Sequence, residues 1–128
     1  MPAIETSIES LEELQEILQN NPGIVILKFS ASWCSPCRAV SSHINAAVAN
    51  LPNTYKIYFL DIDESLEIYA FFKNKRMISA IPSMISWKKG NTTPIPDNMV
   101  TSSDTKQIDA FFQKCANMVW VVRPRGAP

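Results

Sequence analysis

Two cysteines separated by two residues are the part of this sequence best suited to chemistry. The segment Cys34-Ser35-Pro36-Cys37 follows an apolar run and precedes a segment with the apolar spacing of a helix. A helix N-terminus carries unpaired N–H groups and the positive end of the helix dipole, so it favours a cysteine as thiolate, the nucleophilic form. Residues on a first helical turn bring both sulfurs close enough to bond, and proline fits that turn because its missing N–H costs nothing there. We predict a redox-active pair, Cys34 and Cys37.

Other uses of these cysteines compete with redox chemistry. A zinc ion needs four ligands, and the other candidates of suitable type are His43 and Cys115. His43 falls on the helix that follows the pair and Cys115 on the last predicted helix, so a four-ligand site is disfavoured and no metal is expected. An iron–sulfur cluster lacks ligands for the same reason. The remaining alternative is two inert structural cysteines.

Strand and helix patterns alternate along the chain. Five segments show the alternation or the β-branched runs of strands: 4–8, 24–30, 55–62, 84–87 and 93–100. Pro94 and Pro96 restrict the last of these to the edge of a sheet. Four segments have helical spacing and begin near Ser10, Cys34, Asp63 or Ser65, and Ser103. The order β-α-β-α-β-α-β-β-α predicts an α/β fold. Its central mixed sheet has a parallel part and an antiparallel hairpin, with helices on both faces.

Length and composition indicate one globular domain. The chain has 128 residues, of which 46% are hydrophobic, and it carries 12 basic and 12 acidic residues. A neutral chain is unlike a strongly basic nucleic-acid binder, and the apolar run 118–122 is far shorter than the ~20 residues of a membrane span. Three cysteines are too few for a secreted disulfide framework. Residues 1–20 have no basic, apolar leader pattern. We expect a cytoplasmic monomer that binds neither nucleic acid nor membrane.

The motif and its surroundings resemble the thioredoxin family over about residues 4–116. The matching parts are Trp33-Cys34-Ser35-Pro36-Cys37, the preceding Phe29 and Ala31, Asp61-Ile62-Asp63, Ile81-Pro82 and Lys89-Gly90. The resemblance implies a thioredoxin fold over 1–116, with 117–128 as a C-terminal extension. It also implies a cis peptide bond between Ile81 and Pro82 that faces the cysteines and leaves a backbone edge for a substrate strand. Trp33 is implied to be a partly exposed shield of Cys34.

The resemblance further implies a protein dithiol–disulfide oxidoreductase that reduces protein disulfides. Cys34 would attack a substrate disulfide, and Cys37, expected to be the more buried, would attack Cys34 and release the reduced substrate. No cofactor is expected apart from the Cys34–Cys37 disulfide, and electrons would come from NADPH through a thioredoxin reductase. Two alternatives stay open. One is a specialised reductant of one dedicated enzyme; the other is a non-catalytic binding or structural module with the same fold.

Two features depart from the family pattern. The family usually has a buried acid six residues before the first cysteine, where this chain has Lys28, and Phe59 replaces the usual lysine of the neighbouring strand. A lysine in a doubly covered strand is costly unless it is paired or neutral. We hypothesise that Lys28, with Asp61, tunes the Cys37 thiol; the alternative is that Lys28 reaches solvent. Residues 92–104 also lack the glycine found near the family's substrate groove, which predicts a reshaped groove.

Three further residues are assigned structural roles. His43, the single histidine, is predicted to lie at the surface and not to act as a base. Cys115 falls on an apolar stripe and is predicted to be a buried thiol, the alternative being a regulatory thiol. Trp120 is predicted to pack on the domain, the alternative being a contact patch.

Overall fold

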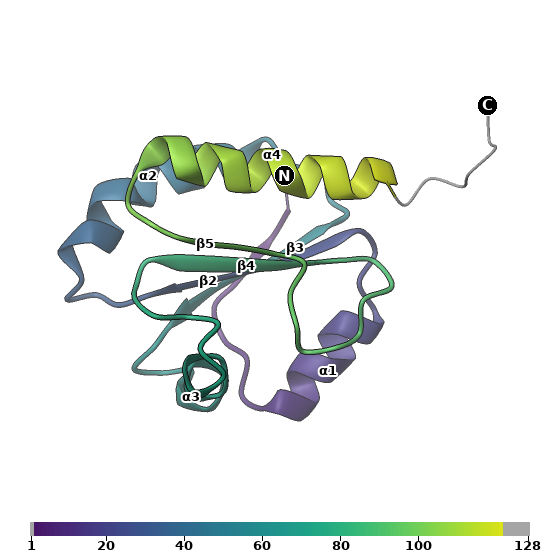
Figure 1. Ribbon diagram of the computed structural model, residues 1–128, viewed down its shortest axis with the longest axis horizontal. Coiled ribbons are helices and arrows are strands. Elements are labelled where there is room, and N and C mark those ends of the chain that lie inside the picture. The colour runs from purple at the N-terminus through teal and green to yellow at the C-terminus, as the bar shows by residue number, and fades with distance from the viewer. Residues whose placement is uncertain (1, 122–128) are drawn as a thin grey trace.

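A five-stranded mixed sheet forms the centre of the protein (Figure 1). The structure is a computed structural model and describes residues 2–121. The strands, in the spatial order β1-β3-β2-β4-β5, are β1 (Ile4–Glu5), β2 (Ile24–Ser30), β3 (Tyr55–Asp61), β4 (Ser83–Lys88) and β5 (Asn98–Thr101). β3 pairs in parallel with β1 and β2, whereas β4 is antiparallel to both β2 and β5. The predicted combination of a parallel part and an antiparallel hairpin is confirmed.

Four helices cover the two faces of the sheet. They are α1 (Leu11–Gln19), α2 (Ser35–Ala49), α3 (Leu66–Asn74) and α4 (Thr105–Val121). In Figure 1, α2 and α4 lie above the sheet, and α1 and α3 lie below it. Val25, Leu27 and Phe29 pack in a core cluster with residues of α1 and α3, while Ile24 and Ile26 pack with residues of α2 and α4. Because both faces of β2 are covered, the strand is apolar almost throughout.

The cap of the last helix differs from its prediction. The sequence predicts Ser10 as the cap of α1, and its hydroxyl accepts a hydrogen bond from the Glu13 N–H at 3.1 Å. Ser103 is predicted to cap the last helix, but an Asp104 carboxylate oxygen instead accepts from the Lys106 N–H at 3.0 Å. The prediction of Ser103 as the cap is therefore wrong. Asp104 suits this position because its carboxylate accepts the N–H and its negative charge interacts favourably with the positive end of the helix dipole.

The segment after β4 is a loop tied by side chains and ends in a short edge strand. The Asp97 carboxylate accepts hydrogen bonds from the Lys88 N–H at 2.9 Å and from the Asn91 amide at 3.0 Å. β5 begins only at Asn98, beyond both prolines of this segment. This agrees with the prediction that the prolines allow only a poor edge strand.

The last helix continues beyond residue 116. α4 runs without interruption to Val121, and Met118 is buried in the same cluster as Cys115. Residues 122–128 and the Trp120 side chain lie outside the described part of the chain, and so does the predicted packing of Trp120. None of the described helices is long and apolar enough to cross a membrane.

Buried Tyr55 makes the core sensitive to alkaline pH. Burial, and secondarily the negative charge of an ionised Cys115, raises the pKa of Tyr55 from 10.0 to about 12. The stability that this proton provides is fully present below about pH 10, where the unfolded chain begins to release it, and is lost as the pH rises towards 12. The free energy of unfolding of the wild type is expected to fall between about pH 8 and about pH 11. In Tyr55→Phe, which has no phenol proton to lose, this fall is expected to be smaller by about 1 kcal/mol. Urea denaturation at both pH values measures the loss; equal losses in the variant and the wild type would contradict the prediction.

Candidate active site

The cysteine pair lies in the turn that joins β2 to α2. The two sulfurs form a disulfide, and the Cα atoms of Cys34 and Cys37 are 5.3 Å apart. The Cys34 N–H donates to the Ala31 carbonyl at 3.1 Å, and Pro36 lies in the first turn of α2. The side chains of Ser35 and Pro36 are exposed between the cysteines. The predicted place of the pair at a strand-to-helix junction is confirmed.

Hydrogen bonding distinguishes the two cysteines, whereas burial does not. Cys34 is the N-cap of α2, and its Sγ accepts a hydrogen bond from the Cys37 N–H at 3.2 Å. When the disulfide is reduced, this bond and the positive end of the helix dipole favour the thiolate at Cys34. The exposed fractions are 5% for Cys34 and 7% for Cys37, so the predicted deeper burial of Cys37 is not found in the disulfide form. The position at the helix terminus therefore favours a thiolate at Cys34 over one at Cys37.

The Ile81–Pro82 step lies against the cysteine pair. Its peptide bond is cis, as the family resemblance implies, and Pro82 is buried. The Ile81 carbonyl oxygen lies 4.0 Å from Cys34 Sγ. Outside helices and strands, none of the backbone–backbone hydrogen bonds of residues 2–121 involves Ile81. An open backbone edge therefore lies next to the sulfur.

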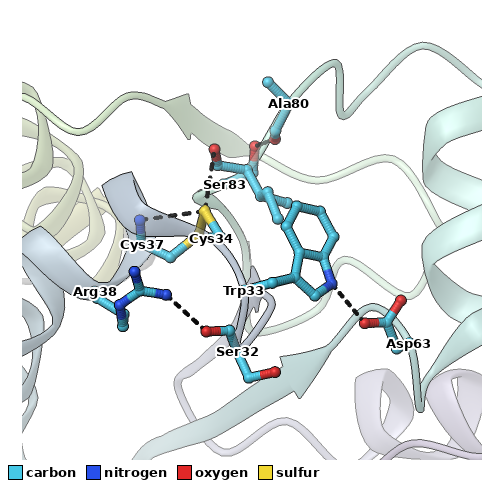
Figure 2. Close-up of a disulfide and its surroundings, with 9 residues drawn as sticks. Ser32, Trp33, Cys34, Cys37, Arg38, Asp63, Ala80 and Ser83 are labelled. Carbon is cyan, nitrogen blue, oxygen red and sulfur yellow. Dashed lines mark hydrogen bonds between the residues drawn. A yellow bond between two sulfur atoms is a disulfide. The ribbon is translucent and has the colours of Figure 1, made fainter.

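Two hydrogen bonds hold the loop before Cys34. The Trp33 side chain is 63% exposed, as predicted, and its ring N–H donates to the Asp63 carboxylate at 2.8 Å. The Arg38 guanidinium donates to the Ser32 carbonyl at 2.8 Å (Figure 2). The sequence predicts Asp63 only as a possible start of the third helix and assigns no role at this site to Asp63 or Arg38. Asp63 belongs to a segment that matches the family pattern. Its contact with Trp33 joins two loops that are distant in the sequence, so no local sequence pattern predicts it.

Lys28 is buried in β2 and has no acidic partner among the described residues. It is 8% exposed, and its Nζ lies 3.9 Å from the centroid of the Phe59 ring. Burial lowers the pKa of Lys28. The register of β2 and β3 places Lys28 opposite Phe59 and Ser30 opposite Asp61, and no Lys28–Asp61 ion pair occurs within the described residues. The hypothesis is therefore corrected for Asp61, whose carboxylate accepts from the Asp63 N–H at 2.8 Å.

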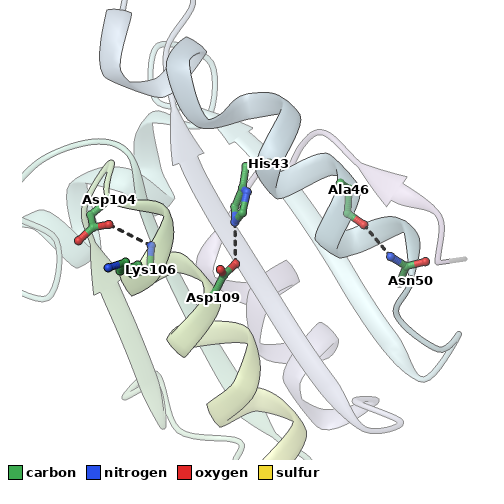
Figure 3. A network of polar contacts seen from close by, with 6 residues as sticks. All are labelled: His43, Ala46, Asn50, Asp104, Lys106 and Asp109. Carbon is green, nitrogen blue, oxygen red and sulfur yellow. Dashed lines mark hydrogen bonds and ion pairs between the residues drawn. The ribbon is translucent and has the colours of Figure 1, made fainter.

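His43 and Cys115 take the structural roles predicted for them. His43 Nε2 lies 2.6 Å from Asp109 Oδ1 and connects α2 to α4 at the surface (Figure 3). Cys115 is fully buried, and its Sγ contacts the Ser86 hydroxyl at 3.4 Å and the Asn98 amide at 3.5 Å. Burial raises the pKa of the Cys115 thiol. In the part of the chain that the structure describes, no three His, Cys, Asp or Glu side chains are grouped to hold a metal ion.

Known proteins share this sequence pattern. A family model described as Thioredoxin matches residues 5–114. The mitochondrial thioredoxin of Bos taurus is 25% identical over 108 residues, which cover 84% of this chain and 61% of the relative. The thioredoxin of Mycoplasma pneumoniae is 31% identical over 85 residues, covering 66% of this chain and 78% of the relative. The chain spans about three fifths of the length of the mitochondrial relatives that it matches.

The fold is also shared with solved structures. Oxidised mitochondrial thioredoxin 3 from Saccharomyces cerevisiae superimposes with a TM-score of 0.68. The superposition covers 86% of this chain and 94% of that one, at 19% sequence identity. At this identity the likeness establishes the arrangement of strands and helices and nothing further.

Proposed function

This chain belongs to the thioredoxin family, and we propose that it reduces disulfides of other proteins through Cys34 and Cys37. The observation that carries the proposal is the geometry of the pair. Cys34 Sγ lies at the N-terminus of α2, accepts the Cys37 N–H and is bonded to the Cys37 sulfur. A dithiol in this arrangement stores two electrons and has one sulfur activated for attack.

The first step transfers a substrate sulfur to Cys34. The Cys34 thiolate attacks one sulfur of the substrate disulfide, a Cys34–substrate disulfide forms, and the substrate S–S bond breaks. The departing substrate sulfur leaves as a thiolate and takes a proton from solvent. The open backbone edge of Ile81, 4.0 Å from Cys34 Sγ, is suited to pair with an extended substrate segment during this step.

The second step releases the substrate. The Cys37 thiol loses its proton, and the resulting thiolate attacks Cys34 Sγ; the mixed disulfide breaks, and the second substrate sulfur leaves as a thiolate that is then protonated. The substrate has gained two electrons and two protons, and the protein holds the Cys34–Cys37 disulfide. Two electrons must then return to the protein. We propose NADPH as their source, through a thioredoxin reductase.

A reducing compartment suits this chemistry. The chain has three cysteines, and Cys115 is a free, buried thiol in the structure. Proteins that depend on disulfides for stability carry more cysteines and pair them. We therefore propose a cytoplasmic location and activity as a monomer. The relatives include proteins named as mitochondrial and chloroplastic thioredoxins, so family membership does not itself specify the compartment.

Insulin reduction tests the proposed activity. With dithiothreitol as electron donor, the protein is expected to accelerate reduction of the insulin interchain disulfides, seen as turbidity of the released chains. An assay without the protein gives the direct rate of dithiothreitol. A wild-type rate equal to this background would overturn the proposal and would favour the non-catalytic module.

We also propose that Lys28 assists the second step. Lys28 lies on the face of β2 that is turned towards α2, the helix that carries Cys37, and it has no anionic partner among the described residues. When it is protonated, its charge favours a thiolate nearby. Its contact with Phe59 keeps the ammonium on this side of the sheet.

Replacing Lys28 by Met is expected to slow release of the substrate at neutral pH. Loss of the positive charge shifts the pH profile of release to higher pH and lowers the rate about three- to tenfold. Stopped-flow decay of a preformed mixed disulfide measures this rate. Lys56→Met is the matched control, because Lys56 lies on the adjacent strand and is exposed. Identical pH profiles for the two variants would rule out a role for Lys28 in release.

A further inference from the structure

Two hydroxyl groups connect the ends of β4 and β5 beside the cysteine pair. Ser83 and Thr101 are partners in the antiparallel ladder, and their hydroxyl oxygens are 2.7 Å apart. The Ser83 hydroxyl also donates to the Ala80 carbonyl at 2.6 Å. A serine hydroxyl has one proton, so Thr101 must be the donor to Ser83. The hydrogen bonds therefore run in one direction, from Thr101 to Ser83 to Ala80.

These two hydrogen bonds hold the turn at Ile81-Pro82, which faces Cys34. Ala80 precedes Ile81 and Ser83 follows Pro82, so the Ser83 hydroxyl ties together the two ends of the turn. Figure 2 draws Ala80 and Ser83 among the surroundings of the Cys34–Cys37 disulfide. Ser83 is 2% exposed, which leaves its side chain little freedom, and Thr101 on the edge strand donates to one of the two acceptor sites of its hydroxyl oxygen. The position of the Ile81 backbone next to the sulfur thus depends on both hydroxyls.

The segment that contributes Thr101 is the one that departs from the family pattern. Residues 92–104 contain no glycine, and a glycine at position 101 would offer no hydroxyl to Ser83. At the groove that the sequence predicts to be reshaped, the structure has a hydrogen bond from Thr101 on the edge strand to Ser83, at the end of the turn before β4.

Resting on the proposed function, we infer that Ser83 and Thr101 are positioning residues for polypeptide substrates. They hold the turn so that the open Ile81 backbone can pair with the extended segment that carries the disulfide. A small disulfide needs only access to Cys34 Sγ and makes no such pairing. The pair therefore favours polypeptide disulfides over small ones without touching the reacting sulfurs.

The test compares two disulfides in the same variants. The pre-reduced protein is mixed with insulin or with hydroxyethyl disulfide, and the rate constant for its oxidation is measured by rapid alkylation. Thr101→Val, which keeps the shape but removes the donor, is expected to lower the ratio of the insulin rate to the small-disulfide rate by roughly three- to tenfold, the effect of one ordinary hydrogen bond. Thr101→Ser is expected to restore the ratio. Thr92→Val, at an exposed threonine of the same segment, is the control and is expected to leave the ratio unchanged.

A double variant tests whether the hydroxyls act together. If Thr101 acts through Ser83, adding Thr101→Val to Ser83→Ala should change the ratio no further than Ser83→Ala alone. The inference is overturned if the Thr101→Val ratio equals that of Thr92→Val, if both rates fall equally, or if Thr101→Ser fails to restore the ratio. If wild-type protein reacts with neither disulfide, the proposed function fails and the inference fails with it. Reaction with both disulfides and no change in Thr101→Val overturns the inference alone.

Discussion

The Cys34→Ser variant is expected to reduce insulin at least about a hundredfold more slowly than the wild type. The hydroxyl that replaces the thiol does not ionise at neutral pH and cannot form the mixed disulfide on which turnover depends. The measurement is the dithiothreitol-driven assay, with circular dichroism to show that the variant is folded. The circular dichroism spectrum of the variant is compared with that of the reduced wild-type protein, because neither has a disulfide between positions 34 and 37.

The matched control for this loss is Cys115→Ser. It makes the same chemical change at a thiol that is fully buried and lies among Ser86 and Asn98, away from the pair. Its insulin reduction is expected to stay within about twofold of the wild type, because Cys115 has no part in either exchange step. A Cys34→Ser variant that keeps more than about a tenth of the wild-type rate would contradict the assignment of Cys34 as the nucleophile.

The Cys37→Ser variant is expected to stop the reaction after the first step. Cys34 still attacks the substrate, but no second thiolate is present to release it, so the mixed disulfide should persist at least about a hundred times longer than in the wild type. Mass spectrometry of a reaction with a disulfide-containing peptide should show one peptide attached per protein molecule. Digestion should place the attachment on Cys34, and dithiothreitol should remove it.

The outcome of this trapping separates the roles of the two cysteines. An adduct on Cys115 would contradict the mechanism, because the structure buries that thiol completely. Release at the wild-type rate would show that Cys37 is not the resolving cysteine. The corresponding Cys34→Ser variant should form no adduct, because the structure places Cys34, and not Cys37, at the N-cap of α2.

The sequence was sufficient where a local pattern has one structural solution. The run 24–30 is apolar on both faces and became the central strand β2, since only a strand with helices on both sides buries such a run. The cysteine motif follows it directly, and a proline in the first helical turn fixed the start of α2. The place of the cysteine pair between β2 and α2 could therefore be predicted from the local sequence.

Contacts between distant segments could not be predicted in the same way. The hydrogen bonds from Trp33 to Asp63 and from Thr101 to Ser83 join segments 30 and 18 residues apart. The Lys28–Asp61 pairing failed because the register of β2 and β3 places Asp61 two residues beyond the partner of Lys28. That register depends on how the whole strands pack and is not visible in the residues around either side chain. These long-range contacts determine how the pair is tuned and presented to substrate.

A redox titration of the Cys34–Cys37 pair tests the central claim most directly. The protein is equilibrated with mixtures of oxidised and reduced dithiothreitol or glutathione, its free thiols are alkylated, and the oxidised fraction is measured by mass spectrometry. A protein disulfide reductase should show a single two-electron transition at a potential below about −200 mV, unchanged in Cys115→Ser and absent in Cys34→Ser. A potential above about −200 mV, or no two-electron transition at this pair, would contradict the assignment as a reductant of protein disulfides.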